Sequence, residues 1–236
     1  MKSKWSAKGG SGVQNCITCA ICAEKRPGSK KSALHSRDPM RQIEQAVRQK
    51  GYKWLAGIDE AGRGPLAGPV VSAAVILPAD FFCPDIRDSK ILSEKKRRQL
   101  FPEIMAHALA VGVGLCDQKE IDATNILAAA LCSMKRAVMN LDPGADFLLV
   151  DGKFPLDTHI PQQAVVKGDS LSLSIAAASI IAKVTRDRIM ATLDQAYPQY
   201  HFIRHKGYPT GVHRQAIKDH GPCPVHRKTF KGVIQG

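Results

Sequence analysis

The stretch Gly-Ile-Asp-Glu-Ala-Gly-Arg-Gly-Pro-Leu-Ala-Gly-Pro, residues 57–69, joins two apolar segments through a glycine-rich turn. The residues before it, 54–59, are typical of a strand, and Pro69–Leu77 is continuously apolar and rich in β-branched residues, as in a buried strand. The acidic pair Asp59 and Glu60 lies where the first segment meets the turn. Adjacent carboxylates repel each other unless a cation lies between them, and glycines let a ligand approach the backbone closely. The stretch therefore indicates a divalent metal and a phosphate-bearing substrate.

Outward from this stretch, strand-like runs alternate with segments of helical spacing. Early strands followed by strands that alternate with helices predict an α/β protein with a mixed central β-sheet flanked by helices. The expected elements are a helix over about 41–50, a helix from an N-cap at Ser93 to about Ala110, a strand over 110–116, a helix over 126–141, strands over 147–150 and 163–167, one long helix ending near Tyr197, and a helix around 211–219.

The charge of the chain is concentrated at its two ends. The formal net charge is +13, of which residues 1–40 and residues 201–236 contribute +6 each. A nearly neutral body with basic ends suits a polyanionic partner, because neutralisation of phosphates by Lys and Arg drives non-specific nucleic-acid binding. The alternative is that the basic ends serve solubility alone.

Residues 1–40 are rich in Lys, Ser and Gly without sustained periodicity, which predicts a basic, disordered N-terminal extension. Within it, Cys16, Cys19 and Cys22 have the spacing of half a zinc or iron–sulfur site, but a closed site needs a fourth ligand and only His35 is nearby. Met40 offers a second start point for the chain.

The compartment is predicted from cysteine usage and from the absence of targeting signals. Seven cysteines is an odd number in a chain too large to need disulfides, which favours a reducing compartment. No apolar run approaches the length of a membrane span, and the N-terminus lacks the hydrophobic stretch of a signal peptide. We expect a cytoplasmic protein that does not bind membranes.

Four carboxylates end three of the expected strands: Asp59 with Glu60, Asp151, and Asp169. Ligands collect at such strand ends in open α/β sheets, so these acids are expected to converge. Two divalent cations would balance their charge, and oxygen ligands without accompanying Cys or His select Mg²⁺ or Mn²⁺. The chemistry that this arrangement serves is two-metal phosphodiester hydrolysis.

Each acid also has a structural alternative or a geometric difficulty. Asp169 could be the N-cap of the helix that follows it, and Asp151-Gly152 could be an ordinary turn. Adjacent strand residues point to opposite faces, so Asp59 and Glu60 can face one pocket only if the chain bends at the glycine turn. The segment from Gly62 to Ala67 also matches the dinucleotide fingerprint G-x-G-x-x-A, but it leads into a strand and not a helix, so we reject that interpretation.

Taken together, the motifs resemble those of ribonuclease H type 2 (ribonuclease HII), in the order of that family, over about residues 54–231. The residues that carry the resemblance are Gly57–Val70, Asp88-Ser-Lys, Val150-Asp-Gly, Lys167-Gly-Asp-Ser, His205-Lys-Gly-Tyr-Pro-Thr and Gly221-Pro-Cys-Pro-Val-His-Arg. The resemblance implies a ribonuclease H-like fold with a C-terminal helical, basic extension. It also implies endonucleolytic cleavage of RNA in RNA–DNA hybrids and incision at ribonucleotides embedded in duplex DNA, on their 5′ side, leaving 3′-hydroxyl and 5′-phosphate ends.

The resemblance also assigns roles to single residues. It makes the four acids Asp59, Glu60, Asp151 and Asp169 the ligands of two Mg²⁺ or Mn²⁺ ions. It places Gly62, Arg63 and Gly64 at the ribose 2′-hydroxyl and its phosphate, and stacks Tyr208 at the RNA–DNA junction. The 2′-hydroxyl is the group that separates RNA from DNA, and an aromatic in a basic, glycine-containing segment suits stacking.

Two further residues complete the predicted substrate site, each with an alternative. Lys90 is expected to contact a phosphate, although a lone lysine in a polar loop is commonly just solvated. Asn125 matches the family pattern but lies at a helix start, where it can serve as a cap.

The predicted organisation is therefore a 1–40 extension and a 41–236 catalytic domain whose segment 200–236 binds substrate. We expect a monomeric hydrolase of DNA replication and repair that acts in ribonucleotide excision on RNA–DNA hybrids and ribonucleotide-containing duplexes. Two competing hypotheses remain: a non-catalytic basic nucleic-acid-binding protein that uses its charged ends, and a zinc or cluster protein built on the three N-terminal cysteines.

Overall fold

In the computed structural model, which describes residues 39–86 and 92–234, five strands form one mixed sheet. The strands are β1 (Leu55–Ala61), β2 (Val70–Ile76), β3 (Ala110–Cys116), β4 (Phe147–Asp151) and β5 (Gln162–Val165). Their order across the sheet is β3-β2-β1-β4-β5. The pairs β1–β2 and β2–β3 are antiparallel, whereas β1–β4 and β4–β5 are parallel. The predicted mixed α/β sheet is confirmed.

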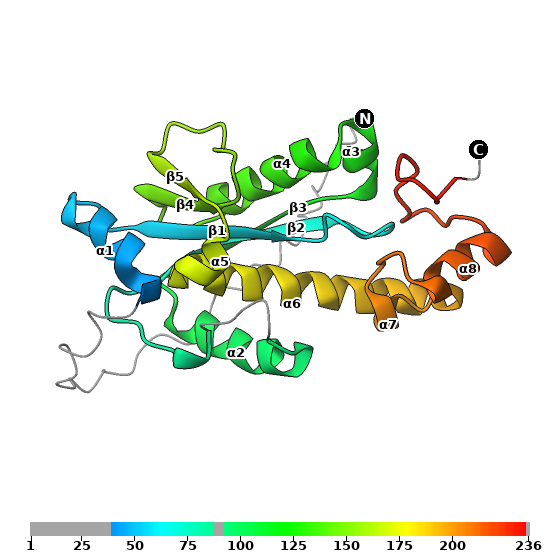
Figure 1. Ribbon diagram of the computed structural model, residues 1–236, viewed down its shortest axis with the longest axis horizontal. Helices are drawn as coiled ribbons and strands as arrows, with labels where there is room; N and C mark the ends of the chain where they lie inside the picture. The colour runs from blue at the N-terminus through cyan, green and yellow to red at the C-terminus, as the bar shows by residue number, and fades with distance from the viewer. Residues whose placement is uncertain (1–38, 87–91, 235–236) are drawn as a thin grey trace, which may run out of the picture. The chain divides into compact units, whose positions relative to one another are not determined.

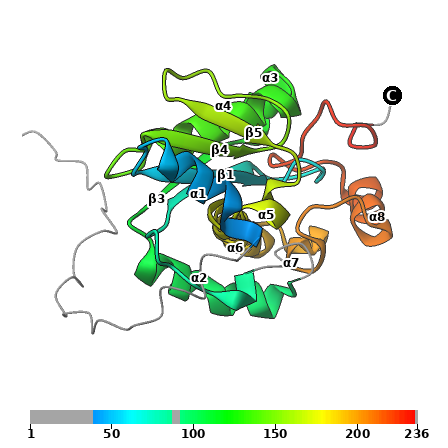
Figure 2. The same ribbon diagram turned by 60° about the vertical axis from the view of Figure 1, so that its left-hand side comes forward.

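Helices cover both faces of the sheet (Figure 1). They are α1 (Gln42–Gln49), α2 (Glu94–His107), α3 (Gln118–Ala123), α4 (Ile126–Met139), α5 (Gly168–Leu171), α6 (Leu173–Ala196), α7 (Phe202–His205) and α8 (Gly211–His220). Helix α4 lies on one face, and α6 lies on the other with α2 beyond it; Figure 2 shows the same layers with α6 nearly end-on. Among the helices in the described part of the chain, none is long and apolar enough to cross a membrane.

Successive side chains of β1 point to opposite faces of the sheet, so β1 contributes to two apolar clusters, one on each face. Ala56 and Ile58 pack in one apolar cluster with residues of α4, such as Met134, whereas Ala61 packs in another with residues of α6. Gly57 shares the second face, and a Cβ there would lie 2.1 Å from the backbone carbon of Ser174. The backbone of α6 therefore rests directly on β1, at a point that only glycine allows.

Most elements agree with the sequence-based prediction, with two corrections. Strand β1 does not end at Asp59 but continues through Glu60 to Ala61, because β2 pairs with it over that whole length. The expected single helix up to Tyr197 is broken into α5 and α6 at Ser172, whose extended backbone lets its side chain accept a hydrogen bond from Ile175 N.

The C-terminal segment is held together by a cluster of three histidines, His205, His213 and His226. The hydrogen-bond network assigns their tautomers. His213 Nδ1 donates to the carbonyl of Tyr208 (3.0 Å), and its Nε2 accepts from His226 Nε2 (3.0 Å). His226 Nδ1 in turn accepts from Cys223 N (3.0 Å), and His205 stacks on His213 at 4.5 Å between ring centroids. Each bridging ring thus uses one donor and one acceptor, which requires that both be neutral.

We expect acidification to destabilise the protein through this histidine cluster. Burial lowers the pKa of His213 to about 4 and that of His226 to about 4; the charge of His205 lowers both pKa values further, and that of His213 also lowers the pKa of His226. Because the folded-state pKa values lie below the ordinary 6.5, their stabilising contribution is complete above pH 6.5 and is lost as the pH falls toward 4. The melting temperature should be lower at pH 5 than at pH 7.5, by roughly 5 °C from these two groups.

The control separates the cluster from the general effect of acid. The variant His226→Gln should lose part of this pH dependence, whereas His159→Gln, at an exposed position, should keep all of it. An identical pH dependence in the wild type and in both variants would contradict the assignment.

Candidate active site

Three of the predicted acids gather at one end of the sheet. Strands β1 and β4 run parallel with Ile58 opposite Val150, so the next residues of the two strands, Asp59 and Asp151, lie side by side where this pairing ends. Asp59, Glu60 and Asp151 each offer a carboxylate oxygen, and these three oxygens lie within 4.8 Å of one another. The structure therefore brings together acids that are 91 residues apart in the sequence.

The sequence predicted that a bend at the glycine turn would bring Asp59 and Glu60 to one pocket, but both residues lie within β1, before that turn. Asp59 shares the face of Gly57, toward α6, and its Oδ1 accepts a hydrogen bond from Glu60 N at 2.7 Å. The pairing of β1 with β4 ends at Ile58, so no strand covers this edge of β1 beside Glu60. We infer that the longer glutamate side chain reaches the shared site around this uncovered edge.

Burial and mutual repulsion disfavour the charged forms of Asp59 and Glu60. Asp59 is 5% exposed, and burial raises the pKa of its carboxyl well above the ordinary value. The charges of Glu60 and Asp151 raise the pKa of Asp59 further, and Lys183 opposes them. Burial also raises the pKa of Glu60, against the opposing effect of Arg63. A cation bound among these carboxylates would reverse both shifts.

The chemistry of the donor set fits a hard divalent ion. All three side chains offer carboxylate oxygens, and within the described residues no Cys or His belongs to the group. Oxygen-only ligand sets favour Mg²⁺ or Mn²⁺ over Zn²⁺. The group is therefore a candidate metal centre, as the sequence predicted for these three acids.

Asp169, the fourth predicted ligand, is not a member of the group of three. It lies in α5, 2% exposed, and it does not cap a helix, because the N-caps of α5 and α6 are Lys167 and Ser172. Its neighbour Gly168 donates its backbone N–H to Asp151 Oδ1 at 2.6 Å. Asp169 thus directly follows a residue, Gly168, that hydrogen-bonds one of the three acids.

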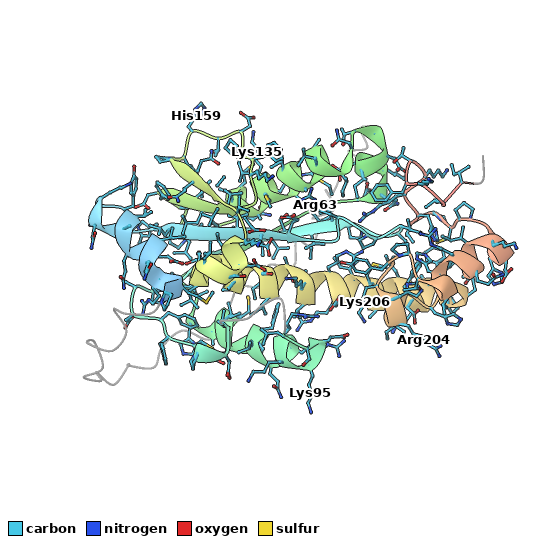
Figure 3. The ribbon with its side chains drawn as sticks, viewed as in Figure 1. Arg63, Lys95, Lys135, His159, Arg204 and Lys206 are labelled. Carbon is cyan, nitrogen blue, oxygen red and sulfur yellow. The ribbon has the colours of Figure 1, made fainter. Side chains whose placement is uncertain are left out.

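The predicted substrate loop adjoins the acids. Arg63 is exposed, and its Nη1 lies 3.2 Å from Glu60 Oε1 (Figure 3). Gly62 has a φ of +103°, a conformation that favours glycine. A Cβ on Gly64 would lie 3.5 Å from the ring of Tyr208, which is 48% exposed. The loop thus links an exposed aromatic ring to the carboxylates.

The remaining two predicted residues are not placed at this site. Asn125 is the N-cap of α4, where its Oδ1 accepts from Ala128 N at 2.9 Å. This is the capping role that the sequence left open. Lys90, like Cys16, Cys19 and Cys22, lies outside the residues that the structure describes.

Two residues of α6 that the sequence reasoning missed face the acids. Ser179 hydrogen-bonds the Asp59 carboxyl and thereby lowers its pKa, and Lys183 donates to Ser179 Oγ. A polar pair four residues apart within the mostly apolar first half of the helix is the signal that could have identified them.

Comparison with known proteins agrees with this geometry. The family model described as Ribonuclease HII matches residues 56–233. Ribonuclease HII from Syntrophotalea carbinolica is 54% identical over 191 residues, which cover 81% of this chain and 91% of that protein. Its counterpart from Citrifermentans bemidjiense is 59% identical over 189 residues, which cover 80% and 82%.

The solved structure of ribonuclease H2 from Pyrococcus horikoshii OT3 superimposes with a TM-score of 0.66 at 27% identity, covering 77% of this chain and 95% of that one. The expected ribonuclease H-like fold is confirmed by this likeness. The chain belongs to the ribonuclease HII family, and that membership supports a ribonuclease H activity.

Proposed function

We propose that this protein is a metal-dependent endoribonuclease that hydrolyses the RNA strand of RNA–DNA hybrids and incises duplex DNA at embedded ribonucleotides. The observation that carries the proposal is the convergence of Asp59, Glu60 and Asp151 within 4.8 Å. Without a cation these closely spaced like charges, one of them buried, are costly, so the arrangement favours a function that requires a cation.

In this proposal, Asp59, Glu60, Asp151 and Asp169 hold two Mg²⁺ or Mn²⁺ ions. Such ions supply a water of lowered pKa and stabilise the leaving oxygen in phosphodiester hydrolysis, which leaves 3′-hydroxyl and 5′-phosphate ends. Asp59 is buried on the α6 side, where Ser179 and Lys183 hold its carboxylate in position as a metal ligand.

The substrate groups come from the loop and the C-terminal segment. The backbone of Gly62 to Gly64 recognises the 2′-hydroxyl, which is the group that distinguishes RNA from DNA. Arg63 contacts the neighbouring phosphate, and the exposed Tyr208 ring stacks on the nucleotide. Lys90 remains a proposed phosphate contact, and Asn125 remains a proposed substrate-binding residue.

The same proposal assigns the rest of the chain. Residues 41–236 form the catalytic domain, and the basic segment 200–236 binds the duplex. The protein acts as a cytoplasmic monomer in DNA replication and repair, where ribonucleotide excision needs this incision.

The test compares three duplexes of one sequence: all-DNA, DNA with one ribonucleotide, and a full RNA–DNA hybrid. With Mg²⁺ or Mn²⁺ the protein should cleave the second and third but not the first, and EDTA should stop both reactions. Folded protein that cleaves none of them with either metal, but binds all three with steep salt dependence, would establish the non-catalytic alternative.

A further inference from the structure

Two buried arginines, Arg186 and Arg227, donate hydrogen bonds to main-chain carbonyls of the glycine loop, residues 62–69. Arg227 donates from Nε to Gly68 O (3.0 Å), from Nη1 to Arg63 O (3.1 Å) and from Nη2 to Gly62 O (2.6 Å). Every nitrogen of this guanidinium thus binds the main chain of the proposed 2′-hydroxyl-recognition loop. The contacts span 159 to 165 residues of sequence.

Arg186, on α6, holds the other side of the loop and also the segment that carries Tyr208. It donates from Nε to Pro69 O (3.0 Å), from Nη2 to Ala67 O (3.2 Å) and from Nη1 to Lys206 O (3.0 Å), two residues before the tyrosine. The residue labelled Lys206 in Figure 3 lies along this junction with α6 and α7. One planar group therefore ties the glycine loop to the Tyr208 segment.

The glycine loop and the Tyr208 segment are in direct contact. Leu66 N donates to Gly207 O at 2.8 Å, next to Tyr208, and Gly64 faces the tyrosine ring. A Cβ on Gly62 would lie 2.2 Å from Arg186 Nε, so the guanidinium packs directly against this backbone. The distance between the Gly62–Gly64 backbone and the Tyr208 ring thus depends on the hydrogen bonds from the two arginines to the carbonyls of both segments.

Each buried guanidinium has a carboxylate whose charge acts on it: Asp187 raises the pKa of Arg186, and Asp122 raises that of Arg227. Arg186 is 2% exposed and Arg227 is 0% exposed, and no carboxylate of the described residues forms a salt bridge with either. Burial lowers the pKa of Arg186 to about 10 and that of Arg227 to about 9. Burial of a charged guanidinium is costly unless its donors are satisfied, and here the main-chain carbonyls satisfy them.

We propose that Arg186 and Arg227 are positioning residues that set the gap between the Gly62–Gly64 backbone and the Tyr208 ring, and thereby align the ribonucleotide with the acids. This inference rests on the proposed ribonucleotide cleavage. Arginine is required because lysine keeps the charge but cannot bind three carbonyls in a planar fork.

The test is single-turnover cleavage of the one-ribonucleotide duplex by the full chain and by Arg186→Lys and Arg227→Lys. Misalignment of a substrate by about 1 Å costs on the order of 100-fold in rate. We therefore expect the rate constant to fall roughly 10- to 100-fold at full amplitude, with unchanged Mn²⁺ affinity. The control is Arg136→Lys, which alters an exposed arginine that donates to Leu115 O away from the loop, and which should stay within about twofold.

A merely structural role has a different signature, because loss of folded protein lowers the amplitude and leaves the rate constant unchanged. An unchanged rate constant, at full or at reduced amplitude, would overturn the proposal. Failure of both lysine variants to fold would also overturn it. A wild-type protein that does not cleave the duplex would instead refute the proposed function itself.

Discussion

Asp59→Asn should lower the single-turnover rate of ribonucleotide cleavage by about a thousandfold or more, because it removes a charged ligand from the shared metal site. The loss should appear in the rate constant and not in duplex binding, since the loop and the basic C-terminal segment are untouched. The measurement is cleavage of the one-ribonucleotide duplex under enzyme excess, alongside a binding titration in EDTA.

The fold should survive this change. Asparagine keeps an Oδ1 acceptor for Glu60 N, and it removes a buried negative charge whose burial raises the pKa of Asp59. In EDTA at neutral pH, the melting temperature of the variant should therefore equal or exceed that of the wild type. The control Asp157→Asn changes an exposed acid that pairs with Lys135, and it should cleave at the wild-type rate. Full turnover by Asp59→Asn would show that the assignment is wrong.

Gly57→Ala should be the most destabilising small substitution in β1. The added Cβ would lie 2.1 Å from Ser174 C, 2.3 Å from Ile175 N and 2.5 Å from Ser174 O. These are backbone atoms of α6, so relief requires that the helix move away from the sheet. We expect a loss of at least about 3 kcal/mol in the free energy of unfolding, which lowers the melting temperature by roughly 10 °C.

The matched control is Gly144→Ala. A Cβ at Gly144 meets nothing within 4 Å, and its backbone is not in the positive-φ region. Urea unfolding should show a change of less than about 0.5 kcal/mol for this variant. Equal stability of the two variants would mean that α6 does not rest on β1 as described.

The convergence of three of the four predicted acids could be anticipated from the sequence because their signal is local. Strand ends can be read from short apolar runs, and the parallel register of β1 and β4 then places Asp59 beside Asp151. The ends of individual elements were harder to predict. That β1 continues to Ala61 depends on pairing with β2, and the break at Ser172 depends on a single side-chain cap.

The contacts that shape the loop could not be predicted at all. Apart from Lys206 O, the carbonyls that Arg186 and Arg227 bind are more than a hundred residues away, and any residue can supply a carbonyl, so no pattern of side chains marks the contact. Asn125, in contrast, could be recognised from the sequence, but its role could not be decided there. Its position at a helix start supported both a cap and a substrate contact, and the structure shows the cap.

The most direct measurement of the central claim is the anomalous diffraction of crystals grown with Mn²⁺. The account predicts a manganese peak within coordination distance of carboxylate oxygens from Asp59, Glu60 and Asp151, and no such peak in crystals of Asp59→Asn. Manganese bound elsewhere on the protein, with these three side chains uncoordinated, would contradict it.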